Sequence, residues 1–341
     1  MTQPILEVSG LQKHFELGGG WLSLGKKRVV DAVSGVSFSI APGETLAVVG
    51  ESGCGKSTVG RCILRLETPS GGEVLLDGGR IDNLPQSKLR ELRKKIQVVF
   101  QDPFSSLNPR LKIRDVLCEP LRNFGIATGR ADMDARVSEL LAMVGLPADS
   151  ADRWPHEFSG GQRQRIGIAR ALAAEPELII CDEAVSALDV SVKAQIVNLL
   201  KDLQEQTGVS LLFISHDLAI VENIAHRIAV MYLGQIVEVA PRREMLANPR
   251  HPYSRALMSA VPIPDPEKTK NRIILQGDLP SPVAPPAGCR FNTRCPHAHD
   301  PCFSKRPAMM GLGEDHLAAC HLNALPDDEN PLTRAVETVG R

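Results

Sequence analysis

The feature that most constrains this chain is a glycine-rich segment, Gly50-Glu51-Ser52-Gly53-Cys54-Gly55-Lys56-Ser57. It matches the pattern G-x-x-x-x-G-K-[ST], whose backbone N–H groups curl around a phosphate. The apolar run at residues 45–49 predicts a buried parallel strand before it, and the residues from Lys56 onward predict a helix after it. Strand, glycine loop and helix are the context that this motif requires. The sequence therefore predicts an α/β fold built around a phosphate-binding loop.

Further strands and a helix are predicted later in the chain. Apolar runs at residues 178–181 and 210–214 are typical of buried parallel strands. Residues 192–206 between them have the pattern of an amphipathic helix, which Thr207-Gly208 ends. Strands that alternate with helices predict a parallel sheet.

Two other regions of the first 250 residues have a different character. Residues 5–8 and 33–40 alternate as β-strands do. Residues 134–144 have helical periodicity, and Gly145 is placed as a helix stop. We therefore expect a helical insertion between about residues 100 and 165.

Two carboxylates follow the apolar run at residues 178–181. Asp182 is suited to hold Mg²⁺ through water, and Glu183 is suited to polarise a water that attacks the γ-phosphate. The loop should supply Lys56 for the β- and γ-phosphates, Ser57 for Mg²⁺, and Thr58 beside the α- and β-phosphates. These residue types predict a site that hydrolyses a nucleoside triphosphate with Mg²⁺.

A second glycine motif, Ser159-Gly160-Gly161-Gln162, leads into a predicted helix at residues 164–173. A Ser-Gly-Gly turn at a helix N-terminus can bind an anion by the same logic as the phosphate loop. With the phosphate loop and the two carboxylates, this motif makes residues 5–250 resemble an ATP-binding-cassette (ABC) ATPase. The resemblance implies a P-loop NTPase fold with a RecA-like parallel core, an antiparallel β subdomain and a helical subdomain at about residues 102–165. It places the nucleotide-binding domain at residues 1–250.

The ABC resemblance also implies roles for residues that mean little alone. His216 would contact the γ-phosphate and orient Glu183, Gln101 would reach Mg²⁺ and the attacking water, and Phe15 would stack on adenine. By themselves, His216 fits a structural hydrogen-bonding role and Phe15 fits a core position equally well. The nucleotide-binding set is then Phe15, Gly50, Glu51, Ser52, Gly53, Cys54, Gly55, Lys56, Ser57 and Thr58; the magnesium set is Ser57, Gln101 and Asp182; the catalytic set is Glu183, His216 and Gln101.

In this family two cassettes pack head to tail, so Ser159, Gly160, Gly161 and Gln162 would act on ATP held by the partner. Asp189 matches the end of the D-loop that links the two sites. The sequence contains no second phosphate loop, so a second chain is required. Two positions depart from the family pattern: Phe158 stands where Leu is commoner, and Ala184 stands where Pro is usual. The second departure predicts a less rigid loop after Glu183.

Cys54 lies inside the phosphate loop. It is either a small loop side chain or a thiol whose alkylation would block nucleotide binding.

The residues after about 250 narrow the resemblance. The stretch at residues 248–257 contains His251-Pro252-Tyr253 and resembles a segment of the ATPases that drive oligopeptide, dipeptide and nickel importers. Within that family it resembles most the ATP-binding subunits of bacterial dipeptide permeases. In that family two different ATPase chains pair beneath two membrane permease subunits, fed by an extracytoplasmic binding protein. The resemblance therefore implies ATP-driven peptide uptake, with a paralogous second ATPase as partner.

Four cysteines, Cys289, Cys295, Cys302 and Cys320, fall in a proline-rich extension at residues 251–341. Their spacing lacks the C-x2-C knuckles of a zinc ribbon, whereas four thiolates can hold a [4Fe–4S] cluster, as the resemblance implies. Zn²⁺ remains an alternative because four histidines lie nearby, and so do uncommitted thiols. We expect a small, irregular, Cys-rich extension that such a site would staple together.

Composition bears on the competing functions. A net charge of −1 and 4% aromatic residues give no electrostatic footprint and no stacking platform for nucleic acid. No apolar run approaches the roughly 18 residues of a membrane span, and the N-terminus lacks the pattern of a secretory signal. We therefore expect a protein that stays in the cytosol, and the resemblance implies that it attaches peripherally to the cytoplasmic face of the inner membrane. A soluble ABC ATPase without a transport role and a redox-sensing iron–sulfur ATPase remain as alternatives.

Overall fold

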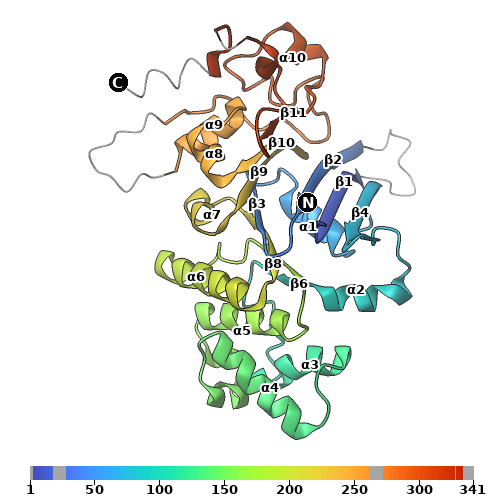
Figure 1. Cartoon of the computed structure of the whole chain (residues 1–341), viewed down its shortest axis with the longest axis vertical. Coiled ribbons are helices and arrows are strands. Elements are labelled where there is room, and N and C mark those ends of the chain that lie inside the picture. The colour runs from blue at the N-terminus through green and yellow to red at the C-terminus, as the bar shows by residue number, and fades with distance from the viewer. Residues whose placement is uncertain (1–2, 18–27, 262–271, 327, 333–341) are drawn as a thin grey trace.

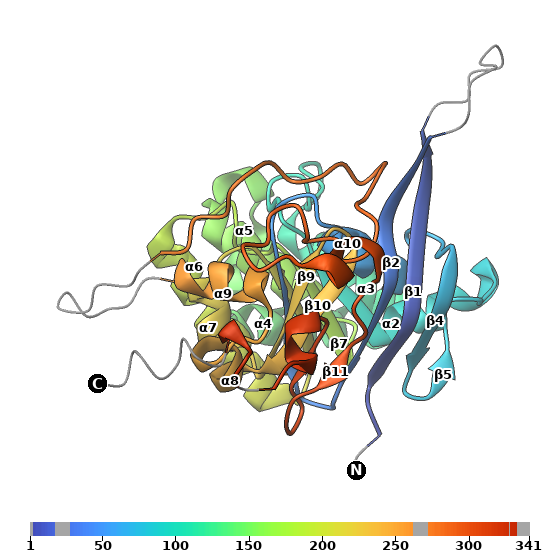
Figure 2. The same ribbon diagram turned by 90° about the horizontal axis from the view of Figure 1, so that it is seen from above.

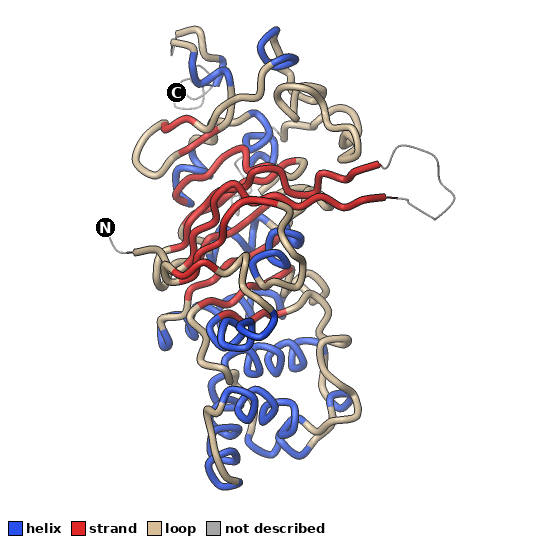
Figure 3. Tube along the Cα trace, turned by 90° about the vertical axis from the view of Figure 1, so that its right-hand side faces the viewer, coloured by secondary structure: helices blue, strands red, loops and turns tan. Residues whose placement is uncertain are grey.

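The computed structural model describes residues 3–17, 28–261, 272–326 and 328–332. The molecule is elongated, with a helical region at one end, two sheets in the middle and the C-terminal residues at the other end (Figures 1 and 3).

The larger sheet has the strand order β11-β12-β10-β9-β3-β8-β7-β6 in the described part of the chain. Strands β6, β7, β8, β3 and β9 run parallel, while β10, β12 and β11 are antiparallel to their neighbours. Their bounds are β3 Thr45–Val49, β6 Ile96–Val99, β7 Leu178–Asp182, β8 Ser210–Ser215, β9 Arg227–Tyr232, β10 Gln235–Pro241, β11 Met310–Gly311 and β12 Leu317–Ala318. The three predicted buried strands are confirmed. Every residue of β3 and β8 is buried, which explains their unbroken apolar runs.

The smaller sheet is antiparallel, in the order β2-β1-β4-β5. Its strands are β1 Leu6–Leu17, β2 Arg28–Ile40, β4 Gly71–Leu76 and β5 Gly79–Arg80. The predicted alternation at residues 5–8 and 33–40 belongs to β1 and β2, which are longer than expected and run together beyond the body of the molecule (Figure 2).

The helices predicted from residue 56 onward and at residues 134–144, 164–173 and 192–206 are present, with ends within a few residues of the predicted ones, whereas the other helices of the first 250 residues were not predicted. Helix α1 (Lys56–Ile63) begins at the loop lysine, and α6 (Val190–Thr207) ends at Gly208, whose φ of 72° is left-handed. The others are α2 Leu89–Lys95, α3 Ile113–Phe124, α4 Arg130–Met143, α5 Gly160–Leu172, α7 Leu218–Ile224 and α8 Arg242–Ala247. Short 3₁₀ turns lie at Gln86–Lys88, Ala148–Asp152 and Pro155–Glu157.

The expected helical insertion consists of α3, α4 and the 3₁₀ turns before α5, and it projects from the sheet at one end of the molecule (Figure 1). Helix α4 ends at Met143, and Gly145 follows with a φ of 68°, as the predicted helix stop requires. Apolar side chains of α3 and α4, such as Leu117 and Leu140, are fully buried in the main core. The ends of this subdomain at residues 102 and 165 stay a prediction.

The C-terminal residues are not the separate, cysteine-stapled extension that we expected. After α9 (Pro252–Ser259), residues 272–299 are irregular as predicted, followed by α10 (Asp300–Ser304) and a 3₁₀ turn at His321–Ala324. However, Tyr253, Met258 and Phe291 are buried in the same core cluster as residues of β7 and β8, and β12 extends the larger sheet by pairing with β10. Tyr253, Met258 and Phe291 bury their apolar surface against the cassette, so this part of the C-terminal residues shares the core of the cassette.

Candidate nucleotide site

A cavity of about 310 Å³ lies where β3 ends and α1 begins. It brings together most of the phosphate loop with Gln101 and Glu183, which are distant in the sequence. Its lining is Val30, Asp31, Ala32, Ser52, Gly53, Cys54, Gly55, Lys56, Ser57, Thr58, Gln101, Glu183, Leu233, Gly234 and Pro282.

The glycines of the loop are required by close backbone packing. A Cβ on Gly50 would lie 2.1 Å from the carbonyl oxygen of Met231, and a Cβ on Gly55 would lie 2.2 Å from that of Ala32. Their φ angles are 155° and 105°, which other residues rarely adopt. The loop therefore fits closely between β2 and the end of β9.

The loop lysine is held against its own loop. The Lys56 side chain is almost fully buried, and its ammonium donates to the carbonyl oxygens of Gly50 at 2.9 Å and Glu51 at 3.0 Å. An ammonium fixed here places a positive charge at the loop that is predicted to bind phosphate.

The two expected magnesium ligands on α1 and β7 are adjacent. Ser57 Oγ donates to Asp182 Oδ1 at 2.7 Å. Burial is the largest cause that raises the pKa of Asp182, with the Ser57 hydrogen bond and nearby cations opposing it. Oxygen donors around an incompletely compensated carboxylate fit a hard divalent cation such as Mg²⁺.

Glu183 stands in a strained turn at the end of β7. Its φ is 50°, in the left-handed region that costs a non-glycine residue about 1–3 kcal/mol. Its N–H donates to the carbonyl of Ile214 at 3.0 Å, and its carbonyl accepts from the N–H and the hydroxyl of Ser186 at 3.0 and 2.9 Å. These three hydrogen bonds hold the turn although Ala184 replaces the expected proline. They therefore oppose the loss of rigidity that the replacement predicts.

His216 follows β8 and meets Glu183. Its Nδ1 lies 3.3 Å from Glu183 Oε1, which joins two of the three expected catalytic side chains across neighbouring strands. The resemblance implies this meeting, and the parallel pairing of β7 with β8 brings the two strand ends together.

The second glycine motif forms the N-terminus of α5. Ser159 Oγ accepts from the Gln162 N–H at 3.3 Å, and Gln162 Oε1 accepts from the Ser159 N–H at 3.0 Å, a reciprocal capping box. Gly160 lies near Leu188 of the predicted D-loop, because a Cβ on it would be 3.6 Å from that side chain. None of Ser159, Gly160, Gly161 and Gln162 lines the cavity of this chain.

Among the expected nucleotide-binding residues, Gly50, Glu51 and Phe15 do not line the cavity, whereas Cys54 does. Phe15 does not line the cavity; instead the Lys13 ammonium lies 4.8 Å from its ring centroid, a cation–π contact. The Cys54 side chain is 1% exposed, and burial raises the pKa of its thiol. A buried, protonated thiol is unreactive, which favours its interpretation as a small loop side chain.

Several cavity residues were missed by sequence reasoning. Asp31 comes from β2, Leu233 and Gly234 from the turn between β9 and β10, and Pro282 from the C-terminal residues. They belong to no local motif, so no sequence signal singles them out.

The metal or cluster site expected at Cys289, Cys295, Cys302 and Cys320 is not supported. Among the residues that the structure describes, no group of three or more His, Cys, Asp or Glu side chains is placed to hold a metal ion. Cys320 packs in a small cluster with Leu322 and Leu332, whereas Cys289 and Cys295 pack against the main core. Burial raises the pKa of Cys320 to about 12, and the other three thiols add to this shift. The Cys289 N–H donates to the carbonyl of Cys302 at 2.9 Å, so at least these two cysteines are neighbours.

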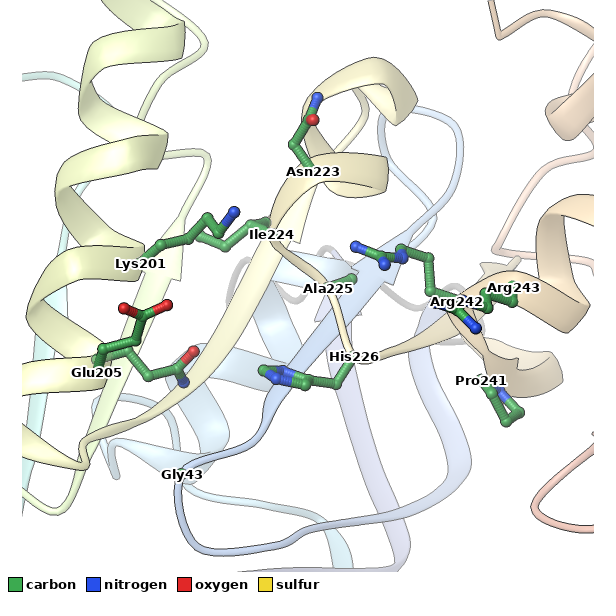
Figure 4. A pocket seen from close by; sticks show the side chains of 11 residues that line it. Gly43, Lys201, Glu205, Asn223, Ile224, Ala225, His226, Pro241, Arg242 and Arg243 are labelled. Carbon is green, nitrogen blue, oxygen red and sulfur yellow. The ribbon is translucent and has the colours of Figure 1, made fainter.

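A separate hollow of about 490 Å³ lies at the opposite end of β3 (Figure 4). Gly43 precedes β3, whereas the phosphate loop follows it, so the two cavities lie at opposite edges of the sheet. Lys201, Glu205, Arg242 and Arg243 line this hollow, and it contains no expected site residue.

No helix in the described ranges is both long and apolar enough to cross a membrane.

Two family models match the chain. The model described as ABC transporter matches residues 33–186, and the model described as oligopeptide/dipeptide transporter, C-terminal region, matches residues 237–302.

Relatives match along nearly the whole chain. A probable peptide ABC transporter ATP-binding protein, y4tS, of Sinorhizobium fredii is 52% identical over 95% of this chain and 91% of its own length. The oligopeptide transport ATP-binding protein AppF of Bacillus subtilis is 51% identical over 94% of this chain and 98% of its own length.

Solved structures match the cassette. The dimeric ATP-binding cassette MJ0796 bound to ADP and Pi, in a post-hydrolysis state, is 30% identical with a TM-score of 0.62 and covers 70% of this chain and 99% of its own. The structure of cbiO1 from Clostridium perfringens is 28% identical with a TM-score of 0.60 and covers 72% of this chain and 91% of its own.

Proposed function

Because this chain belongs to the family of ABC transporter ATP-binding proteins that carry the oligopeptide/dipeptide transporter C-terminal region, we propose that it hydrolyses ATP to drive uptake of dipeptides or oligopeptides. The observation that carries the proposal is the single cavity that joins the phosphate loop to Gln101 and Glu183. The printed names of the relatives, which are peptide transport ATP-binding proteins, support the substrate class.

In the proposed mechanism the chain's own residues bind the phosphates, orient the catalytic carboxylate and accept a proton from water. The loop N–H groups and the Lys56 ammonium bind the β- and γ-phosphates. The Glu183 carboxylate accepts a proton from the attacking water, and His216, 3.3 Å away, orients that carboxylate and contacts the γ-phosphate. When bound, Mg²⁺ would neutralise phosphate charge, held by Ser57, Gln101 and Asp182.

We propose a second cassette as the partner, packed head to tail. The Ser159–Gln162 motif lies outside this chain's own cavity, which leaves it available to a nucleotide on another chain. The solved MJ0796 cassettes are described as dimeric, which supports such a partner. For this chain we propose a paralogous cassette, with Asp189 at the interface.

At the level of the complex we propose two membrane permease subunits, an extracytoplasmic peptide-binding protein and peripheral attachment at the cytoplasmic face of the inner membrane. Gln101 borders both the cavity and the start of the helical insertion, so it can pass closure of the site to that subdomain. A soluble ABC ATPase without a transport role is disfavoured by the match of residues 237–302 to a transporter C-terminal region.

For the four cysteines we propose a [4Fe–4S] cluster, with Zn²⁺ as the alternative, that forms only if the thiols draw together. What supports it is the hydrogen bond from the Cys289 N–H to the Cys302 carbonyl at 2.9 Å, and the position of Cys289, Cys295 and Cys302 inside the matched transporter region. Iron, sulfide and zinc analysis after purification under nitrogen tests it. Absence of all three from a folded preparation contradicts it, and also removes the redox-sensing alternative.

Nucleotide binding to the full chain tests the assignment of the nucleotide site. Wild type should bind MgATP, and Lys56→Ala should lose most of that affinity. Lys201→Ala is the matched control, because Lys201 lines the hollow at the other edge of the sheet. Equal binding by wild type and Lys56→Ala would overturn the assignment of the site.

A further inference from the structure

The C-terminal segment, defined here as residues 250–261 and 272–299, reaches the phosphate loop directly. The Tyr253 hydroxyl accepts a hydrogen bond from the Glu51 N–H at 2.9 Å. The Arg294 guanidinium donates to both carboxylate oxygens of Glu51, at 3.1 and 2.9 Å. The Arg294 side chain is only 8% exposed and the Glu51 side chain is 29% exposed, so the guanidinium end of this ion pair is shielded from solvent.

Glu51 also contacts the loop lysine. Its carbonyl oxygen accepts from the Lys56 ammonium at 3.0 Å. The N–H, the carboxylate and the carbonyl of Glu51 are therefore all engaged, the first two by the C-terminal segment and the third by Lys56. A shift of Glu51 would move an acceptor that holds the ammonium.

The two contacting side chains stand on a rigid base. The rings of Tyr232, Tyr253, His251 and Phe291 pack with centroid separations of 4.7 to 5.7 Å. The Arg294 guanidinium lies 6.0 Å from the Tyr232 ring centroid. Packed aromatic rings in a buried cluster have fixed positions, so they fix where Tyr253 and Arg294 meet the loop.

The same segment also supports the wall of the cavity on the side of β2. The buried guanidinium of Arg290 pairs with Asp31 and donates to Ser34 Oγ at 2.9 Å. The carbonyl of Pro282 accepts from the Asp31 N–H at 3.2 Å, and both Asp31 and Pro282 line the cavity. The C-terminal segment thus contacts the site on two sides.

We propose that the C-terminal segment is a positioning element of the nucleotide site, in which Arg294 and Tyr253 hold Glu51, and through it Lys56, in place for the β-phosphate. Arg294 and Tyr253 are positioning residues, because they act through Glu51. The inference rests on the proposed function, since it requires that the loop binds ATP. It goes beyond that function by giving the C-terminal segment an effect on nucleotide affinity.

A double-mutant cycle on the full chain tests this. MgATP and MgADP affinities are measured for wild type, Arg294→Met, Glu51→Gln and the double variant. Arg294→Met should weaken both nucleotides by about tenfold, within the range of typical coupling between sites. The double variant should bind no more weakly than Glu51→Gln alone, because Arg294 acts through that carboxylate. Arg272→Met, an exposed arginine of the same segment, should bind as wild type does.

Two results overturn the proposal: unchanged affinity in folded Arg294→Met, or losses that simply add in the double variant. If Arg294→Met does not fold, Arg294→Lys and Tyr253→Phe replace it, and wild-type affinity in both overturns the proposal equally. Failure of the proposed function is a different result, in which wild type does not bind MgATP or Lys56→Ala binds it as well as wild type.

Discussion

Ser57 Oγ lies 2.7 Å from Asp182 Oδ1, which joins the start of α1 to the end of β7. This one hydrogen bond links two motifs that are 125 residues apart. It places a hydroxyl and a carboxylate together at the edge of the sheet where Lys56 and Glu183 also lie.

We expect Asp182→Asn to raise the Mg²⁺ concentration that half-saturates ATP hydrolysis by about 10- to 100-fold, because residues in the outer shell of a metal site have effects of this size. Hydrolysis is titrated with Mg²⁺ in the reconstituted complex. Asp149→Asn, at an exposed position, serves as the control. An unchanged Mg²⁺ dependence in Asp182→Asn would exclude this carboxylate from the metal site.

The same substitution should change stability with pH in a defined direction. The pKa of Asp182 is raised above its ordinary value of 3.8, mainly by burial. Its contribution to stability is therefore present below pH 3.8 and is lost as pH rises through the folded pKa. Without nucleotide or Mg²⁺, the melting temperature of Asp182→Asn minus that of wild type should be larger at pH 7 than at pH 3. Thermal unfolding at the two pH values measures this difference.

Gly55→Ala should destabilise the chain and abolish tight nucleotide binding. The new Cβ would lie 2.2 Å from the carbonyl oxygen of Ala32, on a residue whose φ is 105°. A left-handed non-glycine residue alone costs about 1–3 kcal/mol, and the clash adds to this. Urea unfolding measures the loss.

Gly167→Ala in α5 is the matched control for that loss. No heavy atom lies within 4 Å of its added Cβ, so this variant should be neutral or up to about 1 kcal/mol more stable. Equal effects of the two substitutions would show that the close packing of the loop is not what requires Gly55.

His251 should make the protein less stable in mild acid. It caps α9 through Nδ1, which accepts from the Tyr253 N–H at 3.1 Å, and burial lowers its pKa from 6.5 to about 4, with Glu238 opposing the shift. Between pH 6.5 and about pH 4, His251 is protonated in the unfolded chain but not in the folded chain. The free energy of unfolding therefore falls as the pH drops through this window.

His251→Asn keeps a capping side chain that does not titrate. Its difference in unfolding free energy from wild type should therefore shrink across that window. A difference that stays constant from pH 7 to pH 4 would contradict the buried, neutral imidazole.

Sequence patterns predicted the parts of this site that are local. The phosphate loop and the Asp182-Glu183 pair each follow an apolar strand directly, and strands that run parallel must end together. The helix stops at Gly145 and Gly208 were predicted for the same reason, since a left-handed residue ends a helix locally.

The remaining features depend on contacts between distant residues. Arg294 and Tyr253 meet Glu51 across 243 and 202 residues, and no periodic pattern marks such pairs. The resemblance implied a shared site for the four cysteines, but neither it nor their spacing reports which apolar cluster each thiol packs in. Phe15 has the residue type for stacking, yet only its position beside Lys13 shows what contacts its ring.

The most direct test of ATP-driven uptake is peptide transport by vesicles that contain this chain, its partner cassette, the permease subunits and the binding protein. Wild-type vesicles loaded with MgATP should take up labelled dipeptide. Glu183→Gln should still bind ATP but lose at least about 10²-fold in hydrolysis and uptake, because a positioned base contributes that much. Uptake that is undiminished in Glu183→Gln, or that proceeds without ATP, would contradict the account.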